Sequence, residues 1–99
     1  MRAELLNDVD LVYPERALMF RVAGKVRLTL FINENGDVDE VTIIEAKPPD
    51  VFDRSAKEAA LALKYKPAEK LGRPVKSRRT IEVTFDPYNR AQERNVGQR

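Results

Sequence analysis

The sequence predicts an α+β domain, a three-stranded antiparallel sheet of strand order 2-1-3 with two helices packed on one face. Three observations predict this fold class. A chain of 99 residues can bury one small core but not two. Apolar and polar residues alternate over 26–32 and again over 80–85, which is typical of strands buried on one face. Between these strands, residues 53–65 carry apolar side chains at helical spacing.

The first predicted element is a short helix that begins with Pro14 as its first helical residue and ends near Gly24. Proline suits that position because its missing N–H has no intrahelical partner there. The apolar side of this helix is expected to cover the sheet. Residues 1–9 are expected to form a flexible lead-in, with at most one helical turn around 3–6, before a folded domain over 10–87.

A β-hairpin follows, with Asn35-Gly36 at its turn. Asn-Gly is typical of the two-residue type I′ turn, which needs positive φ at both central residues. Val38 is out of phase with the register that this turn sets, which predicts a bulge or a wider turn near Asp39-Glu40. The facing pairs in that register are Leu30 with Val41 and Leu28 with Ile43.

The second helix is predicted over Asp53–Tyr65. Pro48-Pro49 ends the preceding strand, and Asp50 is a candidate N-terminal cap. The helix must stop near Lys66, because Pro67 disfavours helical geometry in the residue before it.

The chain then turns at 71–74 and forms its last strand over Val75–Phe85. A right-handed crossover places this strand beside the first one, which gives the order 2-1-3 and leaves two edge strands. Residues 88–99 are polar and are expected to form a flexible tail.

The residue types exclude most catalytic chemistry. The chain contains no histidine and no cysteine, so it lacks the commonest general base, the thiol nucleophile and the thiolate metal ligand. We therefore expect no enzyme activity, no cofactor and no metal site. The acidic residues around the hairpin fit no calcium-loop spacing, and we interpret them as a solvated strand face. They are Asp37, Asp39, Glu40 and Glu45.

Basic residues are concentrated at 64–79. With Tyr65 among them, this stretch supports an alternative function, the binding of single-stranded nucleic acid. A solvated basic face is favoured, because only one aromatic residue accompanies the charges and the 18 basic residues of the chain face 16 acidic ones. No apolar run approaches the ~20 residues of a membrane span, and residues 1–10 lack the apolar stretch of a signal peptide.

Several motifs at turns and helix ends occur in an order and at spacings that together are specific. They are Tyr13-Pro14, Gly24, Gly36-Asp37-Val38, Ala46-Lys47-Pro48, Phe52-Asp53-Arg54, Ala59, Tyr65-Lys66-Pro67 and Gly72-Arg73-Pro74-Val75. From Asp10 to Pro87 the chain thereby resembles the C-terminal domain of TonB, the bacterial energy transducer. It departs from the family pattern at Leu63, where tryptophan is usual, and at Asp10, where glutamine is frequent. A TolA-like periplasmic spanning domain is the related alternative. Tyr13-Pro14 and Tyr65-Lys66-Pro67 look more like TonB and disfavour it.

The resemblance implies a periplasmic domain of a Gram-negative bacterium that binds the TonB box, the N-terminal segment of an outer-membrane transporter. It implies that the full-length protein is anchored in the inner membrane by an N-terminal helix and a Pro-rich spacer, both absent from this chain. ExbB and ExbD would there supply energy from the proton gradient for uptake of siderophores or other scarce nutrients. Membrane contact is expected only through that anchor, and no cofactor or nucleic-acid partner is implied.

In the family, the receptor segment adds as a strand beside the last strand of the domain, and residues just before Tyr13 make further contacts. An edge strand suits this role because its unpaired N–H and C=O groups bind another chain without demanding particular side chains. The same edges predict a strand-exchanged homodimer in short fragments. The partner-binding residues implied here are Asp10, Leu11, Val12, Tyr13, Pro14, Val75, Lys76, Ser77, Arg78, Arg79, Thr80, Ile81, Glu82, Val83, Thr84 and Phe85.

Overall fold

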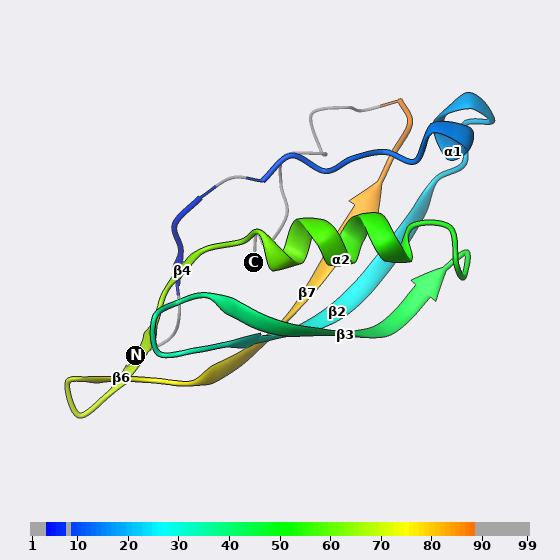
Figure 1. Cartoon of the computed structure of the whole chain (residues 1–99). Coiled ribbons are helices and arrows are strands. Elements are labelled where there is room, and N and C mark those ends of the chain that lie inside the picture. Colours follow the sequence, from blue (N-terminus) through cyan, green and yellow to red (C-terminus); the bar gives the residue numbers. More distant parts are fainter. Residues whose placement is uncertain (1–3, 8, 89–99) are drawn as a thin grey trace.

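The computed structural model describes residues 4–7 and 9–88 of the chain. Its elements in chain order are β1 (Glu4–Leu5), α1 (Glu15–Met19), β2 (Gly24–Ile32), β3 (Val38–Lys47), α2 (Asp53–Leu61), β4 (Tyr65–Lys66), β5 (Ala68–Lys70), β6 (Arg73–Val75) and β7 (Ser77–Phe85) (Figure 1). The strands β3, β2 and β7 form a central sheet, whereas β1 pairs with β4 and β5 pairs with β6 in two small sheets.

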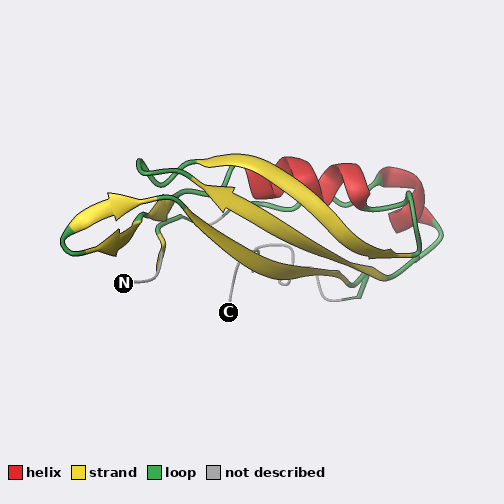
Figure 2. Cartoon of the chain, turned by 90° about the horizontal axis from the view of Figure 1, so that it is seen from below, coloured by secondary structure: helices red, strands yellow, loops and turns green. Residues whose placement is uncertain are grey.

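The central sheet has the order β3-β2-β7 and is antiparallel throughout, which confirms the predicted order 2-1-3. Its middle strand β2 buries alternate residues on one face, and both helices lie on that side of the sheet (Figure 2). α2 approaches this face through small side chains, so the apolar residues of β2 are fully enclosed. The buried residues of the pair are Val26, Leu28, Leu30 and Ile32 on β2, and Ala56, Ala59 and Ala60 on α2.

The hairpin of β2 and β3 has the predicted register. Leu28 faces Ile43 and Leu30 faces Val41. The register shifts between Phe31 and Ile32, where Asp39 is the extra residue, so the predicted bulge is confirmed. A second shift, between Arg27 and Leu28, leaves Ile44 as an extra residue and was not expected.

The turn of this hairpin differs from the prediction. Gly36 has a φ of 87°, but Asn35 is not among the residues with positive φ, so the type I′ turn was wrong. Asn33 organises a wider loop instead. Its side-chain oxygen accepts the N–H of Asn35 at 2.8 Å and the N–H of Asp37 at 3.0 Å, and these two bonds fix the loop without a second positive φ.

α1 is shorter than predicted and lies at one end of the sheet (Figure 1). Pro14 is its N-cap and not its first helical residue. The helix ends in a Schellman arrangement around Arg21, whose φ is 55°. There the N–H of Val22 donates to the carbonyl of Ala17 at 2.7 Å. Ala17 is also the buried residue of α1, so this helix adds to the end of the core.

α2 ends at Leu61 and does not reach Tyr65 as predicted. Its last turn tightens into i to i+3 hydrogen bonds, in which the N–H of Leu63 donates to the carbonyl of Ala60 at 3.2 Å. The expected cap was also wrong, because Asp50 has a φ of 64° and Phe52 occupies the N-cap position without a side-chain hydrogen bond.

Tyr65 and Lys66 are extended and form β4, which pairs with β1. The expected helical turn around 3–6 was therefore wrong. The physical reason lies in Pro67, which favours extended geometry in the residue before it and so leaves a strand edge for β1. Asn7 secures this contact: its amide accepts the N–H of Lys64 at 2.8 Å and donates to the carbonyl of Ala62 at 3.2 Å.

The predicted turn at 71–74 is the tip of a hairpin formed by β5 and β6. Leu71 and Gly72 have φ values of 55° and 77°, and the flanking residues Lys70 and Arg73 face each other. Positive φ at both central residues is the type I′ requirement, so that geometry occurs here and not at the earlier Asn-Gly. The predicted last strand is consequently divided, because Val75 pairs with β5 before β7 begins.

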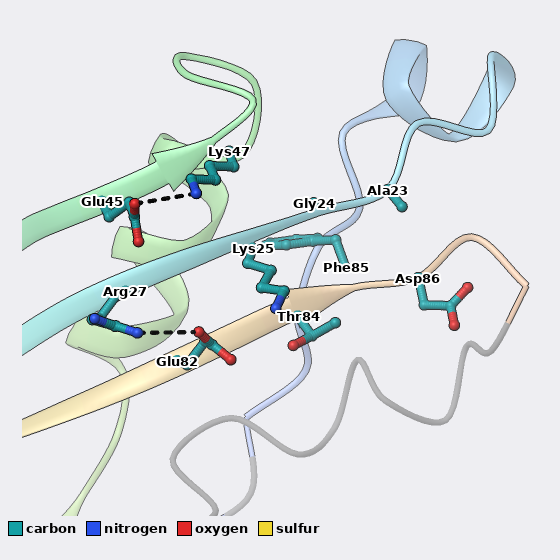
Figure 3. Close-up of a pocket in the computed structure, with 10 residues that line it drawn as sticks. All are labelled: Ala23, Gly24, Lys25, Arg27, Glu45, Lys47, Glu82, Thr84, Phe85 and Asp86. Carbon is teal, nitrogen blue, oxygen red and sulfur yellow. Dashed lines mark ion pairs between the residues drawn. The ribbon is translucent and has the colours of Figure 1, made fainter.

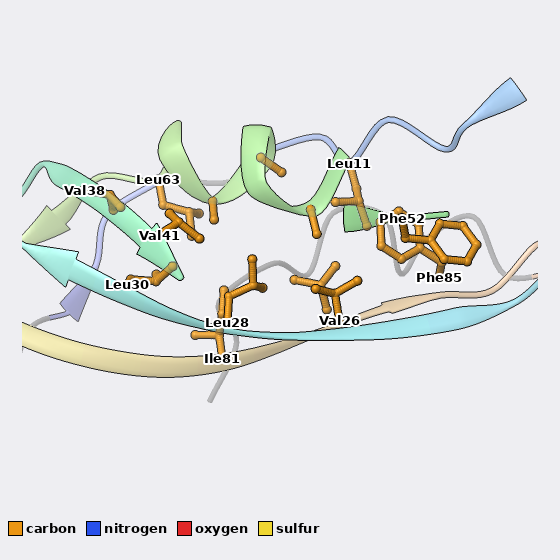
Figure 4. Packing of buried hydrophobic residues seen from close by; sticks show 14 of the residues in the cluster. Leu11, Val26, Leu28, Leu30, Val38, Val41, Phe52, Leu63, Ile81 and Phe85 are labelled. Atoms are coloured by element: carbon orange, nitrogen blue, oxygen red, sulfur yellow. The ribbon is translucent and has the colours of Figure 1, made fainter. Parts of the chain in front are cut away.

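An aromatic cluster joins three distant segments at one end of the core, and Figure 4 shows two of its members, Phe52 and Phe85. Phe52 and Phe85 stack with ring centroids 4.2 Å apart, and Tyr13 meets each of them edge-on at 5.6 Å. Gly24 makes room for them, since an added Cβ would lie 2.5 Å from the Phe52 ring. The cluster thus connects the segment before α1 to α2 and to the end of β7.

We expect Gly36→Ala to destabilise the domain far more than Gly72→Ala, although both glycines have positive φ. An alanine Cβ at Gly36 would lie 1.8 Å from the carbonyl oxygen of Tyr65, whereas nothing lies within 4 Å at Gly72. Backbone strain alone predicts a loss of about 1 to 2 kcal/mol at Gly72, and overpacking adds a further ~1 to 3 kcal/mol at Gly36. Urea unfolding of both variants measures the difference, and equal losses would contradict the packing at Gly36.

Candidate partner-binding edge

The free edge of β7 is the main candidate binding surface. β7 ends the order of the central sheet, so within residues 4–7 and 9–88 no strand pairs with its outer edge. Its pairing with β2 runs from Ser77 to Phe85 without a register shift. The opposite edge strand, β3, is interrupted by two bulges. A regular edge is the better template for another strand, because bulges break the ladder of N–H and C=O groups.

The side chains of β7 alternate between the core and the solvent. Ile81, Val83 and Phe85 are buried, so these predicted site residues could offer a partner only their backbone groups. The outward residues, which are exposed, are Arg78, Thr80, Glu82 and Thr84. Thr80 and Thr29 place their hydroxyl oxygens 3.2 Å apart across the outer face.

Arg79 and Ser77 point to the side of the sheet that carries the helices and β4. The guanidinium of Arg79 lies 5.8 Å from the ring centroid of Tyr65, a cation–π contact that joins β7 to β4. Val75 and Lys76 precede β7: Val75 faces Ala68 in the small sheet of β5 and β6. The predicted continuous strand over Val75–Phe85 therefore contributes nine residues, Ser77–Phe85, to the central edge.

The predicted contacts before α1 lie near the same end of β7. Leu11 and Tyr13 are buried, and Tyr13 packs edge-on against Phe85. Val12 is 70% exposed, and its carbonyl accepts a hydrogen bond from the Ser55 hydroxyl of α2. The segment is thus held against the fold, with Asp10 and Val12 exposed and Pro14 half-buried.

Sequence reasoning missed a shallow groove of about 550 Å³ on the outer face of the sheet, beside the end of β7 (Figure 3). Arg27 of β2 faces Glu82 of β7 across it, with 3.8 Å between Nη2 and Oε2. Lys47 and Glu45 of β3 form a second pair at 3.5 Å. The strand alternation predicts that these residues lie on the outward face. Which charges face each other depends on the register of β2 with β3 and β7.

Three acidic residues of the hairpin, Asp37, Asp39 and Glu45, have structural partners. Asp37 forms an ion pair with Lys64, and Asp39 accepts a hydrogen bond from the Asn33 amide at 2.9 Å. No group of three or more potential metal-ligating residues occurs in the described part of the chain. The basic stretch at 64–79 lacks an accessible aromatic ring, because Tyr65 is 0% exposed. Tyr65 therefore cannot stack on a nucleic-acid base.

Neither α1 nor α2, the helices present in 4–7 and 9–88, has the length and apolar character that crossing a bilayer requires.

Comparison with known proteins identifies the family. The family model described as Gram-negative bacterial TonB protein C-terminal matches residues 9–87. The chain belongs to the TonB C-terminal family. The match covers the aromatic cluster, the central sheet and the edge strand β7, and it favours the TonB interpretation over the TolA-like alternative.

Similar TonB proteins support the assignment. Protein TonB of Escherichia coli K12 is 37% identical over 57 residues, which are 58% of this chain and 24% of that protein. Protein TonB of Pseudomonas aeruginosa is 28% identical over 88 residues, 81% of this chain and 25% of that protein. The chain thus spans about a quarter of the length of these relatives.

The fold agrees with a solved structure of the family. The solution NMR structure of the Pseudomonas aeruginosa TonB C-terminal domain superimposes with a TM-score of 0.72 and 25% sequence identity, over 85% of each chain. Leu63, where the resemblance led us to expect tryptophan, is 2% exposed. A smaller apolar side chain therefore fills that place in the core.

We expect Tyr65→Phe to leave the domain at least as stable at neutral pH, and to make it more stable than wild type at alkaline pH. The Tyr65 hydroxyl is buried and has no hydrogen-bond partner, so its removal relieves a desolvation cost of about 1 kcal/mol. Burial raises the pKa of Tyr65 above its usual value, and the nearby Arg79 lowers it in part.

The sign of the pH effect follows from this raised pKa. Tyr65 stays protonated in the folded state while the unfolded chain ionises near pH ~10, so wild-type stability falls above that pH. Urea unfolding of both proteins at pH 7 and pH 10.5 measures the effect. A stability gap that stays constant between the two pH values would contradict it.

Proposed function

We propose that this domain binds the TonB box of outer-membrane transporters by adding it as a further strand along the free edge of β7. The observation that carries the proposal is the uninterrupted outer edge of Ser77–Phe85 in a member of the TonB C-terminal family. Residues 10–14 lie at the end of this edge through Tyr13 and Phe85, and we propose that Asp10 and Val12 add contacts to the bound segment.

The backbone supplies most of the affinity in this arrangement. Each residue of a flexible receptor segment loses ~1 to 2 kcal/mol of backbone entropy when it is ordered, while each new hydrogen bond contributes only about 1 kcal/mol net. The isolated segment should therefore bind with micromolar or weaker affinity. A contact that depends on the backbone also lets one domain serve several transporters, because it demands few particular side chains.

The proposed role of the whole protein extends beyond this chain. We place the domain in the periplasm, with the full-length protein anchored in the inner membrane and coupled through ExbB and ExbD to the proton gradient. In that role the domain transmits force to a transporter for uptake of siderophores or other scarce nutrients. It is a binding module and not an enzyme, because its residues include no histidine or cysteine for acid-base or nucleophilic chemistry.

Amide hydrogen exchange tests strand addition directly. In the free domain, alternate amides of β7 should exchange rapidly, because successive N–H groups along a strand point to opposite edges and only one edge is paired. A synthetic TonB-box peptide should slow those rapid amides and shift their NMR signals, while the amides directed to β2 change little. Thr80→Ala should have little effect on peptide affinity, since the contact is made by the backbone.

Two outcomes would contradict the proposal. A peptide that binds while every amide of β7 stays unshifted cannot have added as a strand. Tight binding of single-stranded DNA or RNA with a steep dependence on salt would favour the nucleic-acid function instead. The amides of β3 are the internal control, because its bulged edge should remain unprotected.

The same edge predicts self-association of short fragments. A second copy of the domain offers its own edge strand and can pair with β7 as a peptide does. Sedimentation equilibrium should therefore show a concentration-dependent dimer that an excess of TonB-box peptide dissociates. A dimer that persists unchanged in saturating peptide would show that the copies associate through another surface.

A further inference from the structure

The outer face of the central sheet is organised in rows of facing residues. Each row runs from β3 through β2 to β7, and β7 supplies its last member. The rows are Glu45, Arg27 and Glu82; Thr42, Thr29 and Thr80; and Glu40, Phe31 and Arg78. A strand added to the edge of β7 would extend every row by one residue, because directly opposed residues share a face.

The first row contains two acidic residues and one basic residue, so its net charge is negative. Arg27 lies between Glu45 and Glu82, and its guanidinium is 3.8 Å from the Glu82 carboxylate (Figure 3). Glu82 therefore reaches the edge with its charge partly neutralised. A further acidic side chain beside it is disfavoured, and a neutral one is accommodated.

The row of Glu40, Phe31 and Arg78 ends at the edge with a positive charge. Arg78 is exposed, and its partner in the register is Phe31, not an acidic residue. Among residues 4–7 and 9–88 it takes part in none of the ion pairs, and neither does its neighbour Lys76. Both line a second shallow groove beside Phe31 and Glu40. The start of β7 thus presents two cations whose charge is available to a partner.

We infer that Arg78, supported by Lys76, selects an acidic side chain in the added strand and thereby sets the register of that strand on β7. This inference rests on the proposed strand addition, which it refines. The acidic residue lies opposite Arg78, a neutral hydroxyl or β-branched residue follows opposite Thr80, and no acidic residue lies opposite Glu82. Arg78 and Glu82 are four residues apart, about 13 Å along the strand, which exceeds the Debye length of about 8 Å at physiological salt. The two positions are therefore selected independently.

Register needs such a determinant because the backbone supplies none. Every peptide unit of an edge offers the same N–H and C=O groups, so a uniform segment can slide by two residues without losing hydrogen bonds. A single charge pair at a defined position removes this freedom. An acid near the N-terminus of the segment places the remaining residues along β7 only if the added strand runs parallel to it.

A set of three peptides tests the inference. Each is a ten-residue segment of alternating threonine and valine, with Asp, Asn or Lys at its third position. Opposed charges on neighbouring strands change affinity by about two- to fivefold. We expect the Asp peptide to bind wild type about two- to fivefold more tightly than the Asn peptide, and the Lys peptide to bind more weakly by a similar factor.

Arg78→Glu should reverse this order, so that the Lys peptide binds most tightly, and Arg78→Gln should remove the preference. Lys57→Glu is the matched control, because it changes net charge equally on the exposed side of α2 and should keep the wild-type order. A nitroxide at the N-terminus of the Asp peptide should broaden the amides of residues 77–79 and spare those of residues 84–85.

The outcomes separate the inference from the proposed function. Equal affinities of the three peptides, with β7 amides shifted by all of them, would overturn the role of Arg78 and leave strand addition intact. The same order of affinities in Arg78→Glu as in wild type would also overturn it. If no peptide shifts any β7 amide, strand addition fails and the inference fails with it.

Discussion

The aromatic cluster of Tyr13, Phe52 and Phe85 is the contact on which the other parts of the domain depend. These rings come from the segment before α1, the start of α2 and the end of β7, and they stack or meet edge-on within 5.6 Å. Gly24 permits the cluster, because any side chain there would overlap Phe52. One contact therefore closes the core, fixes the end of the edge strand and holds residues 10–14 beside it. The proposed binding surface and the stability of the fold depend on the same residues at this end.

The sequence was sufficient for everything that hydrophobic periodicity controls. Residues of period two and of period 3.6 predicted the strands β2, β3 and β7 and the helix α2. The right-handed crossover then predicted the order of the sheet. The edge strand was predictable for the same reason. The members of the rows across β3, β2 and β7 were not, because the bulges at Asp39 and Ile44 shift the facing pairs in ways that alternation alone does not reveal.

Local backbone chemistry accounts for the wrong predictions. The Asn-Gly turn became wider because the Asn33 side chain satisfies two backbone N–H groups of the loop. Leu71 adopts positive φ although leucine pays for it in strain, since the strands on either side fix the hairpin at two residues. α2 ends four residues early because Tyr65 is held by Gly36, to whose carbonyl its N–H donates at 2.9 Å. The end of α2 depends on a partner that is distant in sequence, whereas residues within a few positions of each turn determine the geometry of the two loops.

The two edges of the sheet differ in how readily they can pair with another strand. β3 carries two extra residues that interrupt its ladder, whereas β7 is regular over its whole length. Bulges are a common protection of edges against unwanted pairing, and the regular edge of β7, which lacks this protection, is what the proposed binding role requires. The core-facing side chains of β7 are buried and cannot reach a partner. Its backbone groups are the same at every residue and cannot distinguish one partner from another. In the proposed strand addition, discrimination between partners would therefore depend on the outward side chains, and the cation with no ion-pair partner in the domain, Arg78, would have the greatest influence on a bound strand.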